Sequence, residues 1–349
     1  MPILKLLLKL FLFPFAIMYD LITRWRNRLY DVGQKKSISF DVLVVNIGNL
    51  TVGGTGKTPH VAMLTEIYSN IFGRKVAILS RGYGRSTKGF LLADQNSSSH
   101  DIGDEPLQLY RALASKIPVA VCEERIVGIP FLLQEFPETD TILLDDAFQH
   151  RKVKPNINIL LCDYNRPFYK DFLLPAGRLR EARQGAKRAD MVIVSKTPEH
   201  ISEEEAHNIK SEIGAYSSAP VFFSKYQYQP PQIFSGDAVQ TIKKVILVTG
   251  IANSKYLLSY VMSQYTLLKH FEFADHINYS EKHIAQIRTY FDSVNQEDTV
   301  VLTTEKDMVK LNELLVGDQK VPYYFLPIQC KILNQEKEFL DCLKKIRLI

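Results

Sequence analysis

The chain alternates short apolar runs with longer amphipathic stretches, and the two patterns predict different elements. Runs rich in Val, Ile and Leu predict buried strands, and stretches with apolar residues every three or four positions predict helices. The strands predicted in the first two thirds of the chain are 41–47, 75–79, 118–122, 141–145, 157–163 and 191–195. The helices predicted between them are 58–71, 105–115, 124–134 and 202–213. This order is typical of a doubly wound α/β fold, whose parallel sheet is covered by helices on both faces.

A second alternation of the same kind follows a Pro- and Tyr-rich stretch at residues 226–231. It comprises a strand at 244–249, a helix at 256–265 and a strand at 299–303. Together these predict a smaller α/β domain at the C-terminal end. Residues 322–328 are predicted to form a returning strand.

The first thirty residues differ in composition from the rest of the chain. Their apolar residues are Leu4, Leu6, Leu7, Leu8, Leu10, Phe11, Leu12, Phe13, Phe15, Ile17 and Met18. The run without charge at 10–19 is about half of the roughly 20 residues that a spanning helix needs, and Pro14 interrupts it. Trp25 among Arg24, Arg26 and Arg28 favours a position at the cytoplasmic membrane surface. We predict an interfacial anchor helix; the alternative is an apolar helix packed on the protein's own core.

These patterns divide the chain into five predicted segments. They are a membrane-associated helix at 1–30, a core domain at 31–225, a linker at 226–243, a smaller α/β domain at 244–320, and a returning linker strand with a C-terminal helix at 321–349.

Composition agrees with this division and excludes several protein classes. A chain of 349 residues with 46% hydrophobic content exceeds what one compact α/β unit usually holds. The net charge of +5 suits an anionic membrane surface or a phosphorylated substrate, but the dense basic runs of a nucleic-acid binder are missing. The four cysteines have no C-x-x-C spacing, which predicts reduced core residues and neither zinc sites nor disulfides.

A Gly-rich loop between the first predicted strand and the first helix carries the strongest chemical signal. Backbone N–H groups of such a loop can surround phosphate oxygens, while Lys57 places a charge at the β and γ phosphates and the Thr58 hydroxyl can ligate Mg²⁺. The first position of the strict G-x-x-x-x-G-K-[ST] pattern is Thr51 instead of glycine, and a Gly-rich turn without a ligand is the alternative. The candidate nucleotide-binding residues are Thr51, Val52, Gly53, Gly54, Thr55, Gly56, Lys57 and Thr58.

Asp145 and Asp146 end an apolar predicted strand and supply carboxylates that can hold Mg²⁺ directly or through water. The two motifs together indicate use of a nucleoside triphosphate. Guanine specificity would require an [NT]-K-x-D element, and the nearest match, at 195–198, lacks the aspartate, so ATP is the predicted nucleotide. Partition-type ATPases carry a lysine directly before the paired glycines, where this chain has Val52. This difference weighs against a membrane ATPase of that type.

Six further blocks give the chain a resemblance to the tetraacyldisaccharide 4′-kinase family over nearly its whole length. They read SRGYGR at 80–85, GDEP at 103–106, LDDAFQH at 144–150, LPAGRLRE at 174–181, FADH at 273–276 and TTEKD at 303–307. The phosphate loop also resembles that of the family, in which the position of Thr51 is not glycine. Ala147 stands where the family usually has glycine, and Ala182 stands where it often has proline. Neither departure removes a chemical group.

The resemblance implies a P-loop NTPase-like doubly wound sheet with a second, smaller α/β domain and an N-terminal membrane-associated helix. It also implies an activity, the phosphorylation with ATP and Mg²⁺ of the 4′-hydroxyl of a tetraacylated glucosamine disaccharide 1-phosphate, a lipid A precursor. The implied location is the cytoplasmic face of the bacterial inner membrane, as a peripheral or monotopic protein on an anionic surface.

Asp104 is the candidate base for the attacking hydroxyl, and its spacing also suits a cap for the helix predicted at 105–115. The resemblance implies that Asp104 acts with His276 as a dyad, and that closure of the two domains completes the site. Glu105, Asp145, Asp146 and Glu181 are acidic candidates for the metal or for hydrogen bonds in the site.

Arginine side chains match phosphate oxygens in pairs, so those of the family blocks are candidates for the substrate phosphate or the transferred group. The predicted substrate residues are Arg81, Tyr83, His150 and Arg180, with Arg85 and Arg178 as further candidates. Tyr83 and His150 depend mainly on the resemblance.

Two other function classes stay open at this point. One is a membrane-associated P-loop ATPase that acts as a switch, and the other is a non-catalytic membrane adaptor with a degenerate loop. The presence of Lys57, Thr58, Asp145 and Asp146 disfavours the adaptor.

Overall fold

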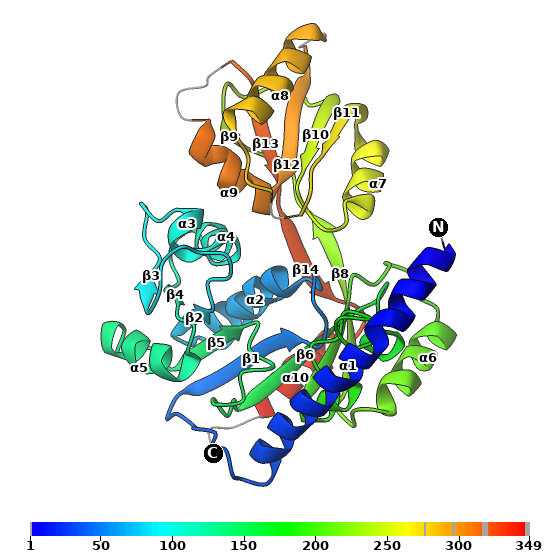
Figure 1. Ribbon diagram of the computed structural model, residues 1–349. Helices are drawn as coiled ribbons and strands as arrows, with labels where there is room; N and C mark the ends of the chain where they lie inside the picture. Colours follow the sequence, from blue (N-terminus) through cyan, green and yellow to red (C-terminus); the bar gives the residue numbers. More distant parts are fainter. Residues whose placement is uncertain (1, 276, 295–296, 316–319, 346–349) are drawn as a thin grey trace.

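The computed structural model describes residues 2–275, 277–294, 297–315 and 320–345, with residues 2–10 described by their backbone alone. Two sheets dominate the described part of the chain (Figure 1). The larger has nine strands, in the order β14-β8-β7-β6-β1-β5-β2-β4-β3. Its strands are β1 (Leu43–Asn49), β2 (Val76–Ser80), β3 (Leu91–Leu92), β4 (Val119–Val121), β5 (Thr141–Asp145), β6 (Ile157–Asp163), β7 (Met191–Ser195), β8 (Val221–Tyr228) and β14 (Ile328–Ile332).

The interior of this larger sheet is parallel, and its two edge strands, β3 and β14, are antiparallel to their neighbours. Parallel strands bring their carboxyl ends to one edge, so the loops after β1, β2, β5 and β7 converge. The helices of this part are α2 (Lys57–Glu66), continued by a π-helical turn at Ile67–Ile71, α3 (Ser99–Ile102), α4 (Asp104–Ala112), α5 (Arg125–Glu135), α6 (Glu203–Gly214) and α10 (Glu336–Lys345). Short 3₁₀ turns lie at Phe168–Lys170 and Arg183–Arg188.

The second sheet has five strands in the order β11-β10-β12-β13-β9, and β9 is antiparallel to β13. Its strands are β9 (Gln232–Ser235), β10 (Lys244–Thr249), β11 (Thr266–Glu272), β12 (Thr299–Thr304) and β13 (Tyr323–Leu326). Its helices are α7 (Lys255–Gln264), α8 (Glu281–Ser293) and α9 (Glu305–Leu314). Figure 1 shows this unit above the larger sheet, with α9 facing α3 and α4.

The pattern of the strands in the larger sheet follows from burial on both faces. Successive residues of a strand point to opposite faces. Val45 and Ile47 of β1 therefore pack in the cluster that contains residues of α2 and α4, and Val44 packs in the cluster that contains residues of α5. Near-continuous apolar runs are what a sheet covered on both sides requires, and they made these strands recognisable.

The predicted parallel α/β fold is confirmed, and the six predicted strands of the larger sheet lie within two residues of β1, β2, β4, β5, β6 and β7. One prediction is wrong: residues 322–328 do not form a single returning strand. Pro327 separates β13 of the smaller sheet from β14 of the larger one, and proline cannot donate a backbone hydrogen bond to either ladder. The stretch at 226–231 does not lie entirely between the two units, since its first three residues belong to β8, which continues to Tyr228. The division into five segments stays a prediction.

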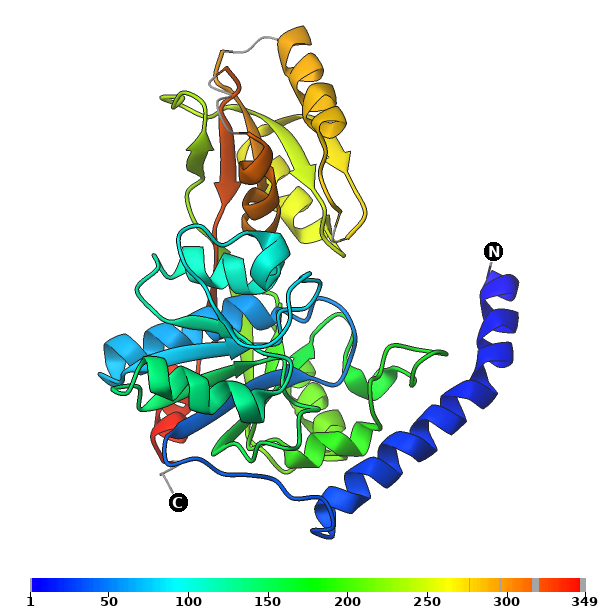
Figure 2. The ribbon, with the colours of Figure 1, turned by 60° about the vertical axis from the view of Figure 1, so that its left-hand side comes forward.

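The N-terminal helix α1 (Pro2–Asp31) lies along one side of the larger unit, with its first turns extending away from it (Figure 2). Ala16 and Thr23 are buried, the Tyr19 hydroxyl donates to the carbonyl of Arg180 at 2.8 Å, and Asn27 donates to Glu181 at 2.8 Å. The opposite side of the helix is apolar and exposed, with Phe11, Phe15, Met18, Leu21, Ile22 and Trp25 each at least half exposed. Within the described residues, no helix combines the length and apolar character that crossing a membrane requires.

The C-terminal helix α10 returns to the larger unit, and Phe339 is its anchor. Its ring is fully buried and packs edge-on against Phe222 of β8, with ring centroids 5.2 Å apart. We expect Phe339→Ala to lower the free energy of unfolding by about 3 to 5 kcal/mol, because it removes a buried ring and leaves a cavity. Urea denaturation measures the change, and Lys337→Ala, at an exposed position of the same helix, serves as the control. A Phe339→Ala variant as stable as this control would contradict the packing.

Candidate active site

The phosphate loop joins the end of β1 to the start of α2, as its sequence predicted. Gly53 and Gly56 have positive φ values of 105° and 86°, a conformation that favours glycine. A side chain at Gly56 would also collide with the hydroxyl of Tyr226 on β8. Lys57 and Thr58, at the start of α2, are both at least nine-tenths buried. The loop thus presents a helix N-terminus and a lysine to whatever binds in it.

Side chains from neighbouring strands hold the loop in this shape. Asn49 donates to the hydroxyl of Thr55 at 2.7 Å, and the Ser195 hydroxyl donates to the Thr55 carbonyl at 2.8 Å. Lys196 donates to the carbonyl of Gly54 and pairs with Asp163 at 2.6 Å. Sequence reasoning missed Lys196 as a member of the site. Its position after β7, where guanine-specific proteins have their lysine, was the available signal.

Asp146 lies between two cations. The ammonium of Lys57 is 3.7 Å from its Oδ2, and Nη1 of Arg180 donates to both carboxylate oxygens at 3.0 Å. Burial by itself would raise the pKa of Asp146, but Lys57 and Arg180 hold it below its ordinary value. The positive φ of this turn, 49°, falls on Asp146, so Ala147 needs no glycine conformation.

Asp145, the last residue of β5, is fully buried without a cation at its carboxylate among the described residues. The Ser80 hydroxyl donates to its Oδ2 at 3.1 Å, while Oδ1 has no hydrogen-bond partner in the described structure. The guanidinium of Arg125, which sequence reasoning also missed, donates to the backbone carbonyl of Asp145 at 2.8 Å. Burial, followed by the charges of Glu105 and Asp146, raises the pKa of Asp145 to about 7.

The unpartnered, buried Oδ1 of Asp145 fits a bound cation. The described residues contain no group of three or more His, Cys, Asp and Glu side chains arranged as a metal site. A Mg²⁺ ion here would therefore take its other oxygen ligands from Thr58, the phosphates and water, as this ion commonly does. Glu105 is half-buried at the start of α4, and its charge helps to raise the pKa of Asp145.

Glu181 is fully buried, and its two oxygens accept hydrogen bonds from three side chains. Arg188 donates at 2.8 Å, Gln149 at 2.9 Å and Asn27 of α1 at 2.8 Å. The carboxylate therefore ties α1 to the segment after β5 and to the 3₁₀ turn that contains Arg188. Nothing in this arrangement supports the predicted role of Glu181 as a metal ligand.

Asp104 is the first residue of α4, and the residue that caps this helix is Gly103. The alternative role of Asp104 as the helix cap is therefore excluded. Its Oδ2 lies 2.7 Å from the ammonium of Lys310, on α9 of the smaller unit. The predicted partner His276 lies outside the described residues, so their pairing stays a prediction.

A cavity of about 460 Å³ lies beside the carboxyl ends of β2, β4 and β5, next to α1. The residues that line it are Arg26, Tyr30, Arg81, Glu123, Glu124, Arg125, Ile126, Gln149, His150, Arg151, Lys152 and Val153. Burial, and then the charges of Arg125 and Arg81, lower the pKa of His150 to about 4, so its imidazole is neutral at pH 7. Two predicted substrate residues, Arg81 and His150, thus share one basic cavity. Tyr83, on the same loop as Arg81, is 76% exposed.

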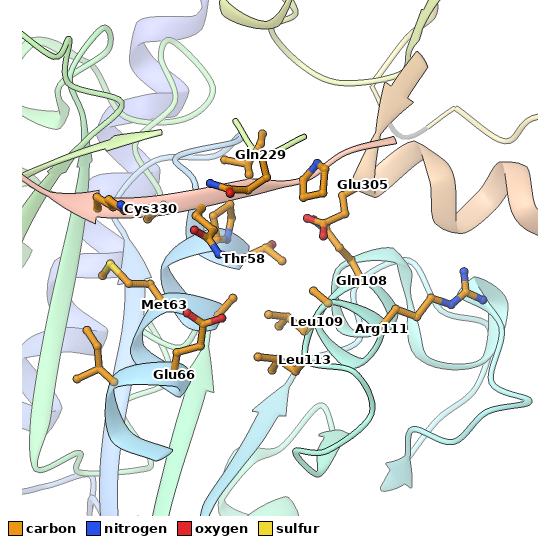
Figure 3. A pocket seen from close by; sticks show the side chains of 18 of the residues that line it. Thr58, Met63, Glu66, Gln108, Leu109, Arg111, Leu113, Gln229, Glu305 and Cys330 are labelled. Atoms are coloured by element: carbon orange, nitrogen blue, oxygen red, sulfur yellow. The ribbon is translucent and has the colours of Figure 1, made fainter. Parts of the chain in front are cut away.

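A larger cavity of about 780 Å³ lies between α2, α4, α9, α10 and the strands that link the two sheets (Figure 3). Figure 3 shows Thr58, Met63 and Glu66 on α2, with Gln108 of α4 and Glu305 of α9 pointing toward one another. Gln108 donates to Glu305 at 3.1 Å, and burial raises the pKa of Glu305. The nucleotide loop and the junction of the two units therefore border the same space.

Comparisons with known proteins find similar sequences and a similar structure. A family model described as tetraacyldisaccharide-1-P 4′-kinase matches residues 8–347. The tetraacyldisaccharide 4′-kinase of Cytophaga hutchinsonii is 43% identical over 338 residues, which are 96% of this chain and 94% of that protein. The protein of the same name from Flavobacterium psychrophilum is 42% identical over 335 residues, 94% of each chain.

A solved structure is also similar to this chain over almost its full length. It is described as the "apo" form of LpxK from Aquifex aeolicus in complex with ATP. The sequence identity is 28%, the TM-score is 0.75, and the match covers 97% of this chain and 99% of that one.

The raised pKa of Asp145 predicts that Asp145→Asn stabilises the folded protein by an amount that depends on pH. The ordinary pKa is 3.8 and the folded value is about 7, so the wild-type carboxyl stabilises the folded protein at low pH, and this contribution is lost as the pH rises through 7. The amide has no such dependence, so the stability advantage of the ligand-free variant should grow by roughly 2 to 3 kcal/mol between pH 5 and pH 8. Urea denaturation at both pH values measures this advantage. Asp140→Asn, at a partly exposed position, is the control, and an equal advantage at both pH values would contradict the burial of this charge.

Proposed function

The chain belongs to the tetraacyldisaccharide-1-P 4′-kinase family, and from this membership we propose how its residues carry out the family's reaction. The protein is a lipid A 4′-kinase. It transfers the γ-phosphate of ATP, with Mg²⁺, to the 4′-hydroxyl of a tetraacylated glucosamine disaccharide 1-phosphate. The observation that carries the assignment of the site is the cluster of Lys57, Asp146 and Arg180 at the mouth of the phosphate loop.

We propose that residues 51–58 bind the triphosphate of ATP. The backbone N–H groups of the loop and the N-terminus of α2 would donate to phosphate oxygens, and Lys57 would neutralise charge on the transferred group. A nucleotide in the loop would compete with Asp146 for the ammonium of Lys57, which at 3.7 Å is only loosely paired. Arg180 would then keep Asp146 ionised and oriented.

Mg²⁺ is proposed to bind between Asp145, the Thr58 hydroxyl and the phosphates, with Asp146 and Glu105 close enough to act through water. The ion supplies positive charge that stabilises the transferred phosphoryl group. For Glu181 we propose a structural role in place of metal binding, since its oxygens are occupied by Asn27, Gln149 and Arg188.

Deprotonation of the acceptor hydroxyl is proposed to involve Asp104 and His276 together. Asp104 belongs to the larger unit, and His276 follows β11 of the smaller unit along the chain. A base assembled from two units forms only when they come together. Without the acceptor, this requirement would slow the unwanted transfer of phosphate to water.

The basic cavity is proposed to receive the phosphate that the acceptor already carries. Arg26, Arg81 and Arg151 offer guanidinium groups to phosphate oxygens there, and the neutral imidazole of His150 can donate a hydrogen bond. Arg125 adds positive charge, while its own guanidinium donates to backbone carbonyls. Tyr83 is proposed to contact the sugar. Gln149 and His150, which line the cavity, follow Asp146 closely in the chain, so an acceptor bound there would lie near the carboxylates.

For α1 we propose a monotopic contact with the cytoplasmic face of the inner membrane, at an anionic lipid surface. Its exposed apolar side chains would enter the interface, while Arg24, Arg26 and Arg28 would lie at headgroup level. The same helix borders the basic cavity through Arg26 and Tyr30. A lipid acceptor could therefore reach the site without leaving the bilayer entirely.

Lys57→Ala tests the phosphate loop. Loss of the ammonium should lower kcat by roughly a hundredfold or more, because charge in the transferred group goes unneutralised. The assay follows radiolabelled γ-phosphate into a tetraacylated glucosamine disaccharide 1-phosphate. Lys187→Ala, at an exposed position, is the control. Near-normal transfer by a folded Lys57→Ala variant would overturn the assignment, and wild-type ATP turnover that ignores the lipid acceptor would favour a switch ATPase instead.

The membrane contact is best tested by substitution, since deletion of α1 would also remove the bonds of Tyr19 and Asn27 to the site. A triple variant with Gln at Phe15, Ile22 and Trp25 should bind phosphatidylglycerol-containing vesicles roughly tenfold more weakly or worse, with ATP affinity unchanged. Met262→Gln, 63% exposed on α7, is the matched control in the flotation assay. Equal flotation of the triple variant and wild type would place the lipid contact elsewhere.

A further inference from the structure

We propose that Lys310 is a positioning residue for phosphoryl transfer, because it joins Asp104 of the larger unit to the segment of the smaller unit that begins next to His276. This inference rests on the proposed function, in which Asp104 takes part in deprotonating the acceptor hydroxyl. It adds a residue of α9 to a site whose other members come from the loops of the larger sheet and from the segment after β11.

Lys310 of α9 contacts two other parts of the chain. Its ammonium lies 2.7 Å from Oδ2 of Asp104, at the start of α4, and donates to the carbonyl of Ile277 at 3.0 Å. Ile277 is the residue after His276 in the chain. The side chains of Lys310 and Asp104 are only 9% and 16% exposed. One cation therefore fixes the carboxylate of the proposed base and the backbone of the segment that follows its proposed partner.

The burial of this ion pair argues for a specific role. Taking two charges out of water opposes folding, and such pairs add little net stability compared with apolar groups of similar size. A buried lysine that pairs across two units is therefore a weak way to hold them together. Its geometric effect is definite, because an ammonium with two oxygen partners at 2.7 and 3.0 Å restricts where Asp104 can point.

Other contacts hold α4 against α9 without Lys310. Gln108 donates to Glu305 at 3.1 Å, and Arg111 donates to the carbonyl of Val309 at 3.3 Å. Glu313 of α9 also holds the neighbouring α3, since it accepts from the backbone N–H of Ser99 at 2.9 Å and from its hydroxyl at 3.2 Å. Apolar packing contributes as well. The buried residues that these helices contribute to one cluster are Leu107, Leu109, Met308 and Val309. Removal of the Lys310 charge should thus leave the two helices docked.

The test is a steady-state comparison of full-length variants in the lipid phosphorylation assay. Lys310→Met keeps the length of the side chain and removes the charge, and it should lower kcat roughly ten- to a hundredfold while the KM for ATP changes less than about threefold. Lys310→Arg keeps the charge and two or more donors, and it should recover at least about a third of the wild-type kcat.

Glu313→Gln is the matched control, because Glu313 also links α9 to the larger unit, through Ser99 of α3, and these hydrogen bonds do not involve Asp104. Its kcat should stay within about twofold of wild type. A double-mutant cycle adds the coupling: Lys310→Met should have little further effect in an Asp104→Asn background, since the residues act through one carboxylate.

The outcomes separate this inference from the proposed function. A wild-type protein that transfers no phosphate to the lipid acceptor would refute the function itself. If the wild type does transfer phosphate, three results would overturn the role of Lys310 alone. They are an unchanged kcat in Lys310→Met, an equal loss of kcat in Glu313→Gln, and independent losses in the double-mutant cycle. Thermal melting checks the fold; where Lys310→Met does not fold, Lys310→Arg is compared with Lys310→Gln, and equal kcat values for the two would overturn the inference.

Discussion

Buried carboxylates near the carboxyl edge of the larger sheet are the constraint on which the rest of the site depends. A desolvated carboxylate needs a cation or several hydrogen-bond donors close by. Asp146 has Lys57 and Arg180, Glu181 has Arg188, and Asp104 has Lys310. Asp145 differs from these three, because its Oδ1 has no partner among the described residues and its pKa rises. Of these four carboxylates, Asp145 is thus the one that lacks a partner for an oxygen in the described structure, and a metal ion there would supply the missing charge.

The cations come from distant parts of the chain, so the same pairs also fix the relative positions of the elements. Arg180 and Arg188 belong to the segment between β6 and β7, which reaches back to the end of β5. Lys310 extends the pattern to the smaller unit, where α9 packs against α4. A rearrangement between the two units would therefore alter the surroundings of Asp104 before it altered those of Asp145 or Lys57.

Helix α1 takes part in the same network from the outside. Its Asn27 occupies an oxygen of Glu181, and its Tyr19 binds the backbone of Arg180, which itself holds Asp146. The residues on its other side expose apolar area that a folded protein in water rarely leaves uncovered over so many neighbouring positions. One helix therefore holds the segment of Arg180 and Glu181 on its polar side and leaves its apolar side exposed for the lipid contact that we propose.

Most of the larger sheet could be predicted from sequence because its signals are local. Continuous apolar runs mark strands such as β5 and β6, and the spacing of glycines before Lys57 marks a phosphate loop wherever a strand and a helix flank it. The loop residues and the pair Asp145 and Asp146 were predicted as site residues for this reason. The break at Pro327 was missed, since apolar residues continue on both sides of it and only strand pairing assigns them to different sheets.

The tertiary structure decided which charges meet. Three cations of the site were missed because they stand in amphipathic or polar stretches, where a charged residue is ordinarily expected to be exposed to solvent: Arg125, Lys196 and Lys310. Folding brings each of them to partners that are tens or hundreds of positions away in the chain. The structural role that we propose for Glu181 rests on the same kind of contact, because its donors come from α1, the segment after β5 and a 3₁₀ turn. Sequence by itself determined the fold class, the nucleotide loop and the family, since these depend on neighbouring residues. Electrostatic partnership depends on distances of about 3 Å between residues far apart in the chain, and only the folded structure determines it.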